Sequence, residues 1–314
     1  MKEPAICPLC KRRLKTKLIV DFLFCEKCEI AVRNEIYMPL SRANIYDEEW
    51  AESQGNEKYN FRRAVFAQKQ IRQLDGITTV LDIGCGTGIL VNILSRKGYM
   101  MDGIDTSPEA IEFAKSHRKG NFHLSSIESF RSEYKYDLVI VTQLIEHLRN
   151  PESLLINVKR LLKPGGYVYV ETPNLYSWNK TSIWRRRIGG MWYGRDHRIC
   201  YTAKSLLTLL RDNGFEICQV LTKTYSPTIL VEIITTLVFA FEKKATAQKE
   251  LLASGLANNK AGRLFKGICE CIYKLGRDSL IVDIILFIPN KISEFGECGN
   301  QLIVIAKNGA QKNI

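Results

Sequence analysis

Short apolar runs alternate with amphipathic segments through the middle of this chain. The runs have the length of buried strands, and the segments between them carry apolar residues at helical spacing. We expect strands at 79–83, 100–104, 121–124, 136–141, 166–171, 215–221 and 301–306, and helices at 61–74, 88–97, 108–116 and 152–162. Regular alternation of strand and helix predicts a parallel sheet with right-handed crossovers. The expected fold class is therefore α/β.

Residues 80–88, VLDIGCGTG, join the first of these strands to the helix that follows it. A buried strand that ends in alternating glycines forces a tight turn and lets backbone amides approach a ligand. Asp105 follows at the expected end of the second strand, where a carboxylate can accept hydrogen bonds from both hydroxyls of a ribose. A dinucleotide fingerprint would need a small residue at Ile89, and no GxxxxGK[ST] phosphate loop occurs in the chain. The pattern predicts a nucleotide site, with a plain structural turn as the alternative.

Composition adds an expectation about partners and compartment. The 314 residues are 46% hydrophobic and 25% charged, as in ordinary globular proteins, but the net charge is +12. Such an excess favours an anionic partner: nucleic acid, a phospholipid surface or a phosphorylated substrate. The start, MKEPAICPLC, lacks the apolar run of a signal peptide, and the longest apolar stretch, 227–241, is shorter than the roughly 20 residues that span a bilayer. We therefore expect a cytoplasmic protein with reduced cysteines.

Residues 1–42 form a distinct unit with two C-x2-C knuckles. Cys7 and Cys10 make the first knuckle, and Cys25 and Cys28 the second, with 14 residues between them. Each knuckle can point two thiolates at one metal, and two knuckles close a tetrahedron. We expect a strand at 18–24 to bring the knuckles together, and a structural Zn²⁺ to supply most of the folding energy of so small a unit. Four unrelated thiols are the alternative.

The glycine motif followed by Asp105 resembles class I S-adenosylmethionine-dependent methyltransferases. The runs YDLVIVTQLIEHLRNPESLL, RLLKPGG and VETPN resemble the ubiquinone-type O-methyltransferases and relatives that act on sugars and lipids, many of which carry an N-terminal cysteine knuckle. The resemblance implies a Rossmann-like seven-stranded sheet, mostly parallel with an antiparallel last strand. It places the methyltransferase domain at 43–225 and 293–314 and leaves 226–292 as a helical insertion.

The same resemblance implies which residues hold the cofactor, S-adenosylmethionine. The glycine turn and the acid before it would cradle the methionine part, and the acid after the second strand would hold the ribose. The positions after the third strand would contact adenine, although an aspartate is commoner there, and one residue after the fourth strand would line the pocket. The set is Asp82, Gly84, Cys85, Gly86, Gly88, Asp105, Thr106, Ser126, Ile127 and Gln143.

Two histidines are candidate catalytic residues. In ubiquinone-type enzymes a Glu-x-x-Glu-His run can bind a divalent metal, but Gln143 replaces its first glutamate here, and a neutral amide is a weaker ligand for Mg²⁺. Magnesium is therefore disfavoured, and Glu146 and His147 are expected to shape the pocket. His197 lies in a segment, 174–204, where seven basic residues and one acid are interleaved with aromatics, which suits a phosphate attached to a planar or sugar ring. Removing a proton from a hydroxyl near pH 7 needs a group that titrates there, as imidazoles in general do, so His197 is the candidate general base.

These patterns leave several functions open. The first is O-methylation of a small-molecule, sugar, quinone or lipid-linked anionic acceptor, with the insertion at 226–292 acting as a lid, a contact with the inner face of the membrane or a homodimer contact. The second is RNA methylation, which the net charge favours, but the fourth strand leads into Thr142-Gln143-Leu144-Ile145 and not into a base-amine motif. The third is a non-catalytic binding protein that keeps the fold.

Overall fold

The computed structural model of the chain describes residues 6–14, 16–19, 22–34, 57–176, 197–223, 225 and 301–309. Two expectations fall largely outside these ranges, namely the basic segment at 174–204, of which 177–196 are not described, and the insertion at 226–292. Within the described part of the chain, no helix combines the length and the apolar character that crossing a membrane requires.

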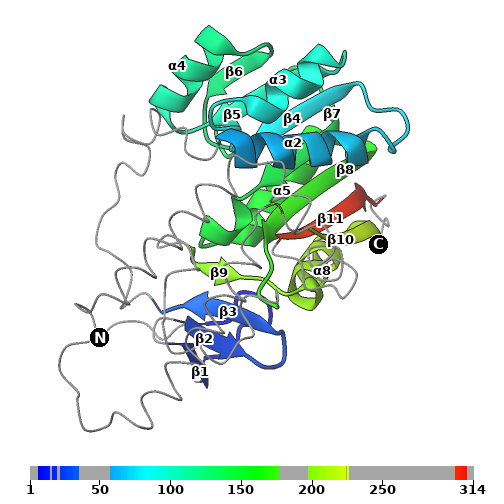
Figure 1. The fold of residues 1–314 in the computed structure, drawn as a ribbon. Coiled ribbons are helices and arrows are strands. Elements are labelled where there is room, and N and C mark those ends of the chain that lie inside the picture. Colours follow the sequence, from blue (N-terminus) through cyan, green and yellow to red (C-terminus); the bar gives the residue numbers. More distant parts are fainter. Residues whose placement is uncertain are drawn as a thin grey trace, which may run out of the picture.

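The core is a seven-stranded sheet in the order β10-β11-β8-β7-β4-β5-β6 (Figure 1). Its strands are β4 Thr79–Ile83, β5 Met100–Asp105, β6 Asn121–Leu124, β7 Tyr136–Thr142, β8 Leu162–Pro173, β10 Phe215–Lys223 and β11 Gln301–Asn308. The strands from β8 to β6 pair in parallel, and β11 lies antiparallel between β8 and β10. The expected mostly parallel sheet with an antiparallel last strand is confirmed.

Helices cover both faces of this sheet because neighbouring residues of each strand point to opposite sides. On one face, Val80 packs with apolar residues of α2 (Glu57–Ile71), α3 (Ile89–Arg96) and α4 (Pro108–His117). On the other face, Leu81 packs with α5 (Pro151–Leu161) and α8 (Ala203–Asp212). The three-layer arrangement leaves the carboxyl ends of the parallel strands as the open edge where ligands bind in such sheets.

Two elements differ from the expectations in instructive ways. The fifth expected strand, β8, begins at Leu162, so the Lys163–Gly166 turn is an irregular start to the strand. The pairing of β7 with β8 shifts between Tyr136 and Leu138, which accommodates the two glycines. The single strand expected at 18–24 is wrong: β1 (Thr16–Ile19) and β2 (Phe22–Cys25) form an antiparallel pair, which satisfies ladder hydrogen bonds that one isolated strand would leave open.

A second sheet, in the order β1-β2-β3-β9, lies beside the core (Figure 1). The cysteine knuckle at 25–28 forms the turn from β2 into β3 (Ile30–Arg33). The fourth strand, β9 (Ile199–Cys200), comes from the segment just before α8, and it pairs with β3 through Ala31↔Cys200 and Val32↔Ile199. The N-terminal unit therefore shares a sheet with residues that lie far along the chain.

Candidate functional site

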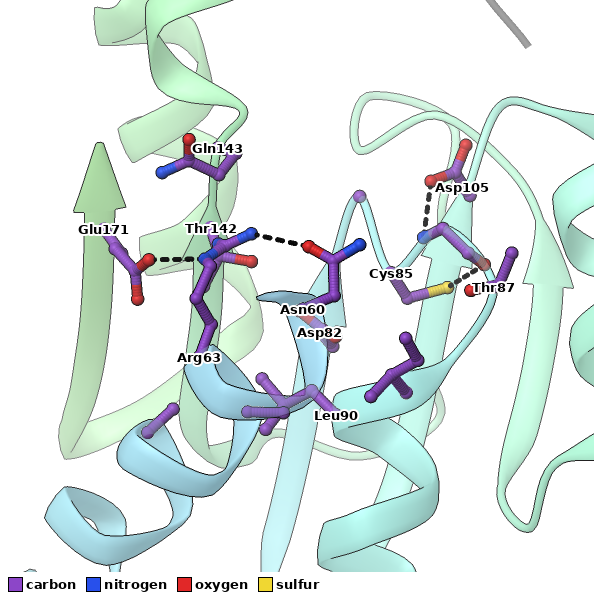
Figure 2. Close-up of a pocket in the computed structure, with 15 residues that line it drawn as sticks. Asn60, Arg63, Asp82, Cys85, Thr87, Leu90, Asp105, Thr142, Gln143 and Glu171 are labelled. Carbon is purple, nitrogen blue, oxygen red and sulfur yellow. Dashed lines mark hydrogen bonds and ion pairs between the residues drawn. The ribbon is translucent and has the colours of Figure 1, made fainter. Parts of the chain in front are cut away.

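The turn between β4 and α3 forms one side of a cavity at the carboxyl ends of the central strands (Figure 2). Gly84, Gly86 and Gly88 have φ angles of 73°, 51° and 75°, a region that residues with a side chain rarely adopt. The backbone N–H groups of Gly84 and Cys85 donate to the Ile104 carbonyl at 2.8 and 3.0 Å. These two bonds hold the turn against the end of β5, with backbone rather than side chains on the cavity side at Gly84 and Gly86.

Asp105, at the end of β5, also binds the glycine turn, through its side-chain carboxylate. The Gly86 N–H donates to its Oδ2 and the Ser107 N–H donates to its Oδ1, each at 2.9 Å, and the residue is buried. A carboxylate oxygen can accept two hydrogen bonds, so each oxygen keeps capacity for another donor. Asp105 lines the cavity and can therefore accept hydrogen bonds from a ligand while it fixes the glycine turn.

Asp82, from β4, is a second carboxylate on the cavity wall. It is buried, and its Oδ1 has no hydrogen-bond partner among the described residues. Burial raises its pKa, the Arg63 guanidinium opposes this and the Asp105 carboxylate adds to it, so the pKa is about 7. An unpartnered buried oxygen costs free energy unless a donor reaches it. A cationic group of a ligand in this cavity would supply that donor.

Arg63 and Glu171 form a buried ion pair on the wall opposite the glycine turn (Figure 2). Arg63, on α2, donates from Nε to Glu171 Oε1 at 2.6 Å and from Nη1 to Asn60 Oδ1 at 3.2 Å. Tyr169 donates its hydroxyl to Glu171 Oε2 at 3.2 Å. The sequence motifs do not indicate this ion pair; the available signal is a single acid, Glu171, in an apolar strand that is buried on both faces. The ion pair attaches α2, which covers the cavity, to β8.

Gln143, the residue after β7, is held in an unusual conformation beside this pair. Its φ is 51°, which is rare for a residue other than glycine. The Gln143 N–H donates to the Glu171 carbonyl at 2.8 Å, and Nε2 donates to Gln301 Oε1 at 2.8 Å. Gln301 Nε2 in turn donates to the Tyr59 hydroxyl at 3.1 Å. A chain of hydrogen bonds from β11 and α2 thus maintains the Gln143 backbone at the cavity edge.

The cavity wall includes six of the ten residues that the resemblance assigned to the cofactor: Asp82, Gly84, Cys85, Gly86, Asp105 and Gln143. The wall, as far as the structure describes the chain, does not include the other four. Gly88 packs under the turn against Phe122, and Thr106 precedes the N-cap of α4. Ser126 and Ile127 follow β6, where the Ser126 hydroxyl contacts Ser129 and the Ile127 carbonyl accepts from Arg160. Thr87 and Asn60 also line the cavity, and neither was a candidate.

The two candidate histidines, 50 positions apart in the chain, lie together. The His147 and His197 rings are 4.8 Å apart between centroids at an interplanar angle of 79°, and their nitrogens lie within 4.8 Å of a Glu146 carboxylate oxygen. Glu146 is buried and accepts from Thr172 Oγ1 at 3.0 Å, and burial raises the pKa of its carboxyl. The Arg63 guanidinium on the cavity wall opposes this rise in pKa, so the cluster lies near the cavity.

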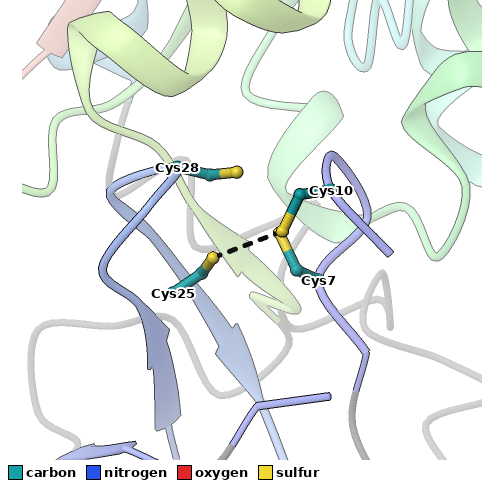
Figure 3. A group of neighbouring side chains, drawn as sticks. All are labelled: Cys7, Cys10, Cys25 and Cys28. Carbon is teal, nitrogen blue, oxygen red and sulfur yellow. Dashed lines mark hydrogen bonds between the residues drawn. The ribbon is translucent and has the colours of Figure 1, made fainter. Parts of the chain in front are cut away.

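The four cysteines of the knuckles converge at the edge of the second sheet (Figure 3). Their sulfur atoms all lie within 4.8 Å of one another, and Cys10 Sγ is 3.7 Å from Cys25 Sγ. Cys7 and Cys25 are buried, and burial raises the pKa of Cys7 to about 11. Four converging sulfurs are the donor set of structural zinc sites, in which the metal replaces the thiol protons.

Comparisons with known proteins bear on the same regions. The model of a family described as "Methyltransferase domain" matches residues 47–220. Ubiquinone biosynthesis O-methyltransferases from Hydrogenovibrio crunogenus and Nitrosospira multiformis are 34% and 30% identical, over 42% and 47% of this chain and 57% and 66% of theirs. The chain thus spans less than two thirds of the length of these curated relatives.

A solved complex between the Haloferax volcanii Trm112 methyltransferase activator and a methyltransferase shares the fold. It has a TM-score of 0.53 and 14% sequence identity, over 86% of this chain and 100% of that one. Together with the family match across more than half of the chain and the seven-stranded sheet, the comparisons assign the protein: this chain belongs to the methyltransferase-domain family.

Proposed function

We propose that this chain transfers the methyl group of S-adenosylmethionine to an oxygen atom of a small acceptor, with quinone-type phenols as the first class to test. The single observation that carries the proposal is the cavity in which the glycine turn, Asp82 and Asp105 meet. Transfer to oxygen is supported by the relatives from Hydrogenovibrio crunogenus and Nitrosospira multiformis, both named O-methyltransferases of ubiquinone biosynthesis.

The residues of the cavity fit this cofactor group by group. Asp82, with its unpartnered buried oxygen, suits the α-ammonium group, and the glycine turn leaves room for the methionine part beside it. Asp105 retains acceptor capacity for the ribose hydroxyls. When bound, S-adenosylmethionine supplies an electrophilic methyl group on a positively charged sulfur. The contribution of the protein is then mainly to orient the acceptor and to exclude water.

The histidine pair is the candidate device for removing the proton from the acceptor hydroxyl. An imidazole titrates close to neutral pH, so His197 can accept a proton from a hydroxyl placed beside it. The Glu146 carboxyl lies next to His197, and in its ionised form it favours the imidazolium that results. Phenols are acidic enough for such a base, which is a further reason to test them first.

The acceptor is identified by incubating the protein with methyl-labelled cofactor and separate phenol, sugar, lipid-extract and RNA fractions. We expect label on a phenolic oxygen, or on a lipid-linked acceptor that would bring the protein to a membrane surface. Label found in RNA, with binding that weakens steeply with salt, would replace this proposal by nucleic-acid methylation. No cofactor binding in calorimetry would leave a non-catalytic protein and overturn the proposal.

Replacement of His197 by alanine should slow turnover at least tenfold because it removes the proton acceptor. Cofactor affinity should stay within about twofold of the wild-type value, since His197 is not part of the cavity wall around the glycine turn. Steady-state rates and calorimetry measure the two effects. His117→Ala, on the exposed face of α4, is the control and should retain full rate. An unchanged rate in His197→Ala would exclude the histidine as base.

Asp82 makes the ligand-free protein less stable as pH rises. Between pH 4 and 7 the folded protein keeps a proton that the unfolded chain has lost, because burial raises the pKa from 3.8 to about 7. The free energy of unfolding should therefore fall by up to about 4 kcal/mol across this interval and then level off. In Asp82→Asn that fall should be absent. Urea midpoints at pH 5 and 8 test it, with Asp75→Asn at an exposed site as control; equal pH slopes in wild type and Asp82→Asn would contradict it.

We further propose that the four converging cysteines hold a structural Zn²⁺. The support is the arrangement of four sulfur atoms with no position left for a water or a substrate. Cys25→Ser should lower bound zinc from one per chain to less than about a tenth, because a serine hydroxyl is a poor zinc ligand. Elemental analysis measures this, and Cys218→Ser, at an exposed thiol on β10, should keep its metal. Full zinc content in Cys25→Ser would place the metal elsewhere.

A further inference from the structure

The N-terminal unit that contains the four cysteines, called the cysteine unit below, makes hydrogen bonds and an ion pair with residues on both sides of β9. On one side, the Glu29 carbonyl accepts from Thr202 Oγ1 at 2.9 Å, and Glu29 Oε1 pairs with Lys204 at 2.7 Å. On the other side, the Arg33 N–H donates to the Arg198 carbonyl at 2.8 Å. Residues 198–204 are therefore bonded both to Glu29, in the turn before β3, and to Arg33, at the end of β3.

Arg33 adds a direct bond to the candidate base. Its Nε donates to the His197 carbonyl at 2.7 Å, and its guanidinium carbon lies 4.6 Å from the centre of the Phe22 ring. Arg33 is only 6% exposed. A buried, charge-assisted hydrogen bond to a backbone carbonyl is strong and directional. The position of the His197 backbone therefore depends on β3.

The opposite side of the same segment is bonded to the methyltransferase core. The Arg198 N–H donates to the Glu146 carbonyl at 2.8 Å, and the His197 ring packs edge-on against the His147 ring. Residues 197–198 are consequently held between β3 on one side and the Glu146–His147 turn on the other. A displacement of β3 would move His197 relative to His147, while the glycine turn and Asp105, which no hydrogen bond among the described residues joins to β3, would stay in place.

We propose that Arg33 is a positioning residue through which the metal-bound cysteine unit sets the geometry of the His147–His197 pair. This inference rests on the proposed function, since it assigns the unit a role in the acceptor half of that reaction. The route is short: the knuckle at 25–28 is the turn that leads into β3, and β3 ends at Arg33. The four cysteines would hold the metal and thereby fix the turn that leads into β3, and Arg33 would then set the position of the His197 backbone.

Histidine-ring NMR tests the coupling without any need for activity. The chain has four histidines, so a spectrum of 13C-labelled Cε1–H groups contains four signals that single substitutions assign. Arg33→Met removes the donor and keeps an unbranched side chain over Phe22, whereas Arg33→Lys keeps a cationic donor. We expect Arg33→Met to shift the His147 and His197 signals and leave those of His117 and His123 unchanged. Arg33→Lys should restore them at least in part.

Removal of the metal from the intact chain should reproduce the Arg33→Met spectrum, and added Zn²⁺ should reverse the change. Glu152→Gln is the matched control, because it weakens another contact of the cysteine unit, the 2.8 Å ion pair with Lys11, which involves neither Arg33 nor His197. It should leave all four signals in place. Unmoved His147 and His197 signals in Arg33→Met or in the metal-free protein would overturn the proposal.

Kinetics separate this role from the proposed function itself. In Arg33→Met, kcat on the true acceptor should fall at least tenfold while cofactor affinity stays within twofold, and Arg33→Lys should recover most of the rate. An equal loss of rate in Glu152→Gln would show that docking of the whole unit matters and not the bond to His197, which would overturn the proposal. If the wild-type protein methylates nothing, the proposed function fails, and the NMR result still decides whether Arg33 positions the histidines.

Discussion

Replacement of Asp105 by asparagine is expected to weaken S-adenosylmethionine binding by at least 100-fold. The amide would place an NH2 group against either the Gly86 or the Ser107 N–H, both of which donate to the carboxylate at 2.9 Å. Hydrogen bonds to a charged group contribute roughly 1.5–3 kcal/mol each, so losing the charge toward the two ribose hydroxyls should cost about 3 kcal/mol of binding free energy. Titration calorimetry with the cofactor measures this directly.

The control for this prediction is Glu109→Gln, which removes an exposed carboxylate at the start of the same helix, α4. It should bind the cofactor as the wild type does. Circular dichroism should show Asp105→Asn to be folded, so that lost affinity reports the site and not general unfolding. Cofactor affinity within about threefold of wild type in Asp105→Asn would mean that the cavity beside the glycine turn is not where the cofactor binds.

Gly88→Ala is expected to lower the free energy of unfolding by about 3 kcal/mol. Gly88 has a φ of 75°, and a Cβ there would lie 2.6 Å from Cε1 of Phe122 and 3.1 Å from Cβ of Ala114. Phe122 is buried in the core, so its ring has little room to withdraw. The left-handed backbone contributes about 1–2 kcal/mol of the loss and the overlap contributes the rest. Urea unfolding followed by fluorescence gives the value.

Gly76→Ala separates the two causes. Gly76 has a similar φ of 72°, but a Cβ there would meet nothing within 4 Å. It should lose only the backbone part, about 1 kcal/mol. The double variant Gly88→Ala with Phe122→Leu should recover some of the overlap cost relative to the sum of the single changes. Equal losses at the two glycines would show that the ring does yield.

Local patterns predicted most of the core because each strand is a contiguous apolar run. The positions of Val80 to Gly88 and of Asp105 followed from a strand that ends in glycines and from the length of one strand–helix–strand unit. The cap of α4 likewise depends on local chemistry: Ser107 Oγ accepts from the Ala110 N–H at 3.1 Å, and Pro108 occupies the first helical position. These features depend on residues that are close in the chain, so the periodicity and the spacing of the sequence are enough to predict them.

Features that depend on distant partners were not predictable in this way. The Arg63–Glu171 pair joins residues 108 positions apart, and neither residue carries a motif that names the other. The two-residue strand β9 is too short to produce an alternation, so its pairing with β3 was not expected. The histidine pair is intermediate: both residues were candidates individually, but nothing in their spacing indicated that the rings would meet.

The place of β11 in the sheet has a consequence for the order of folding. This strand begins at Gln301, long after β10 ends at Lys223, yet it lies between β8 and β10 with residues 301–306 buried. During synthesis, β8 and β10 must wait with unpaired edges until residue 308 has left the ribosome, and closing so long a loop is slow. Nascent chains stalled before residue 301 should therefore stay sensitive to protease and bind chaperones, because β8 and β10 join one sheet only after β11 has paired with both.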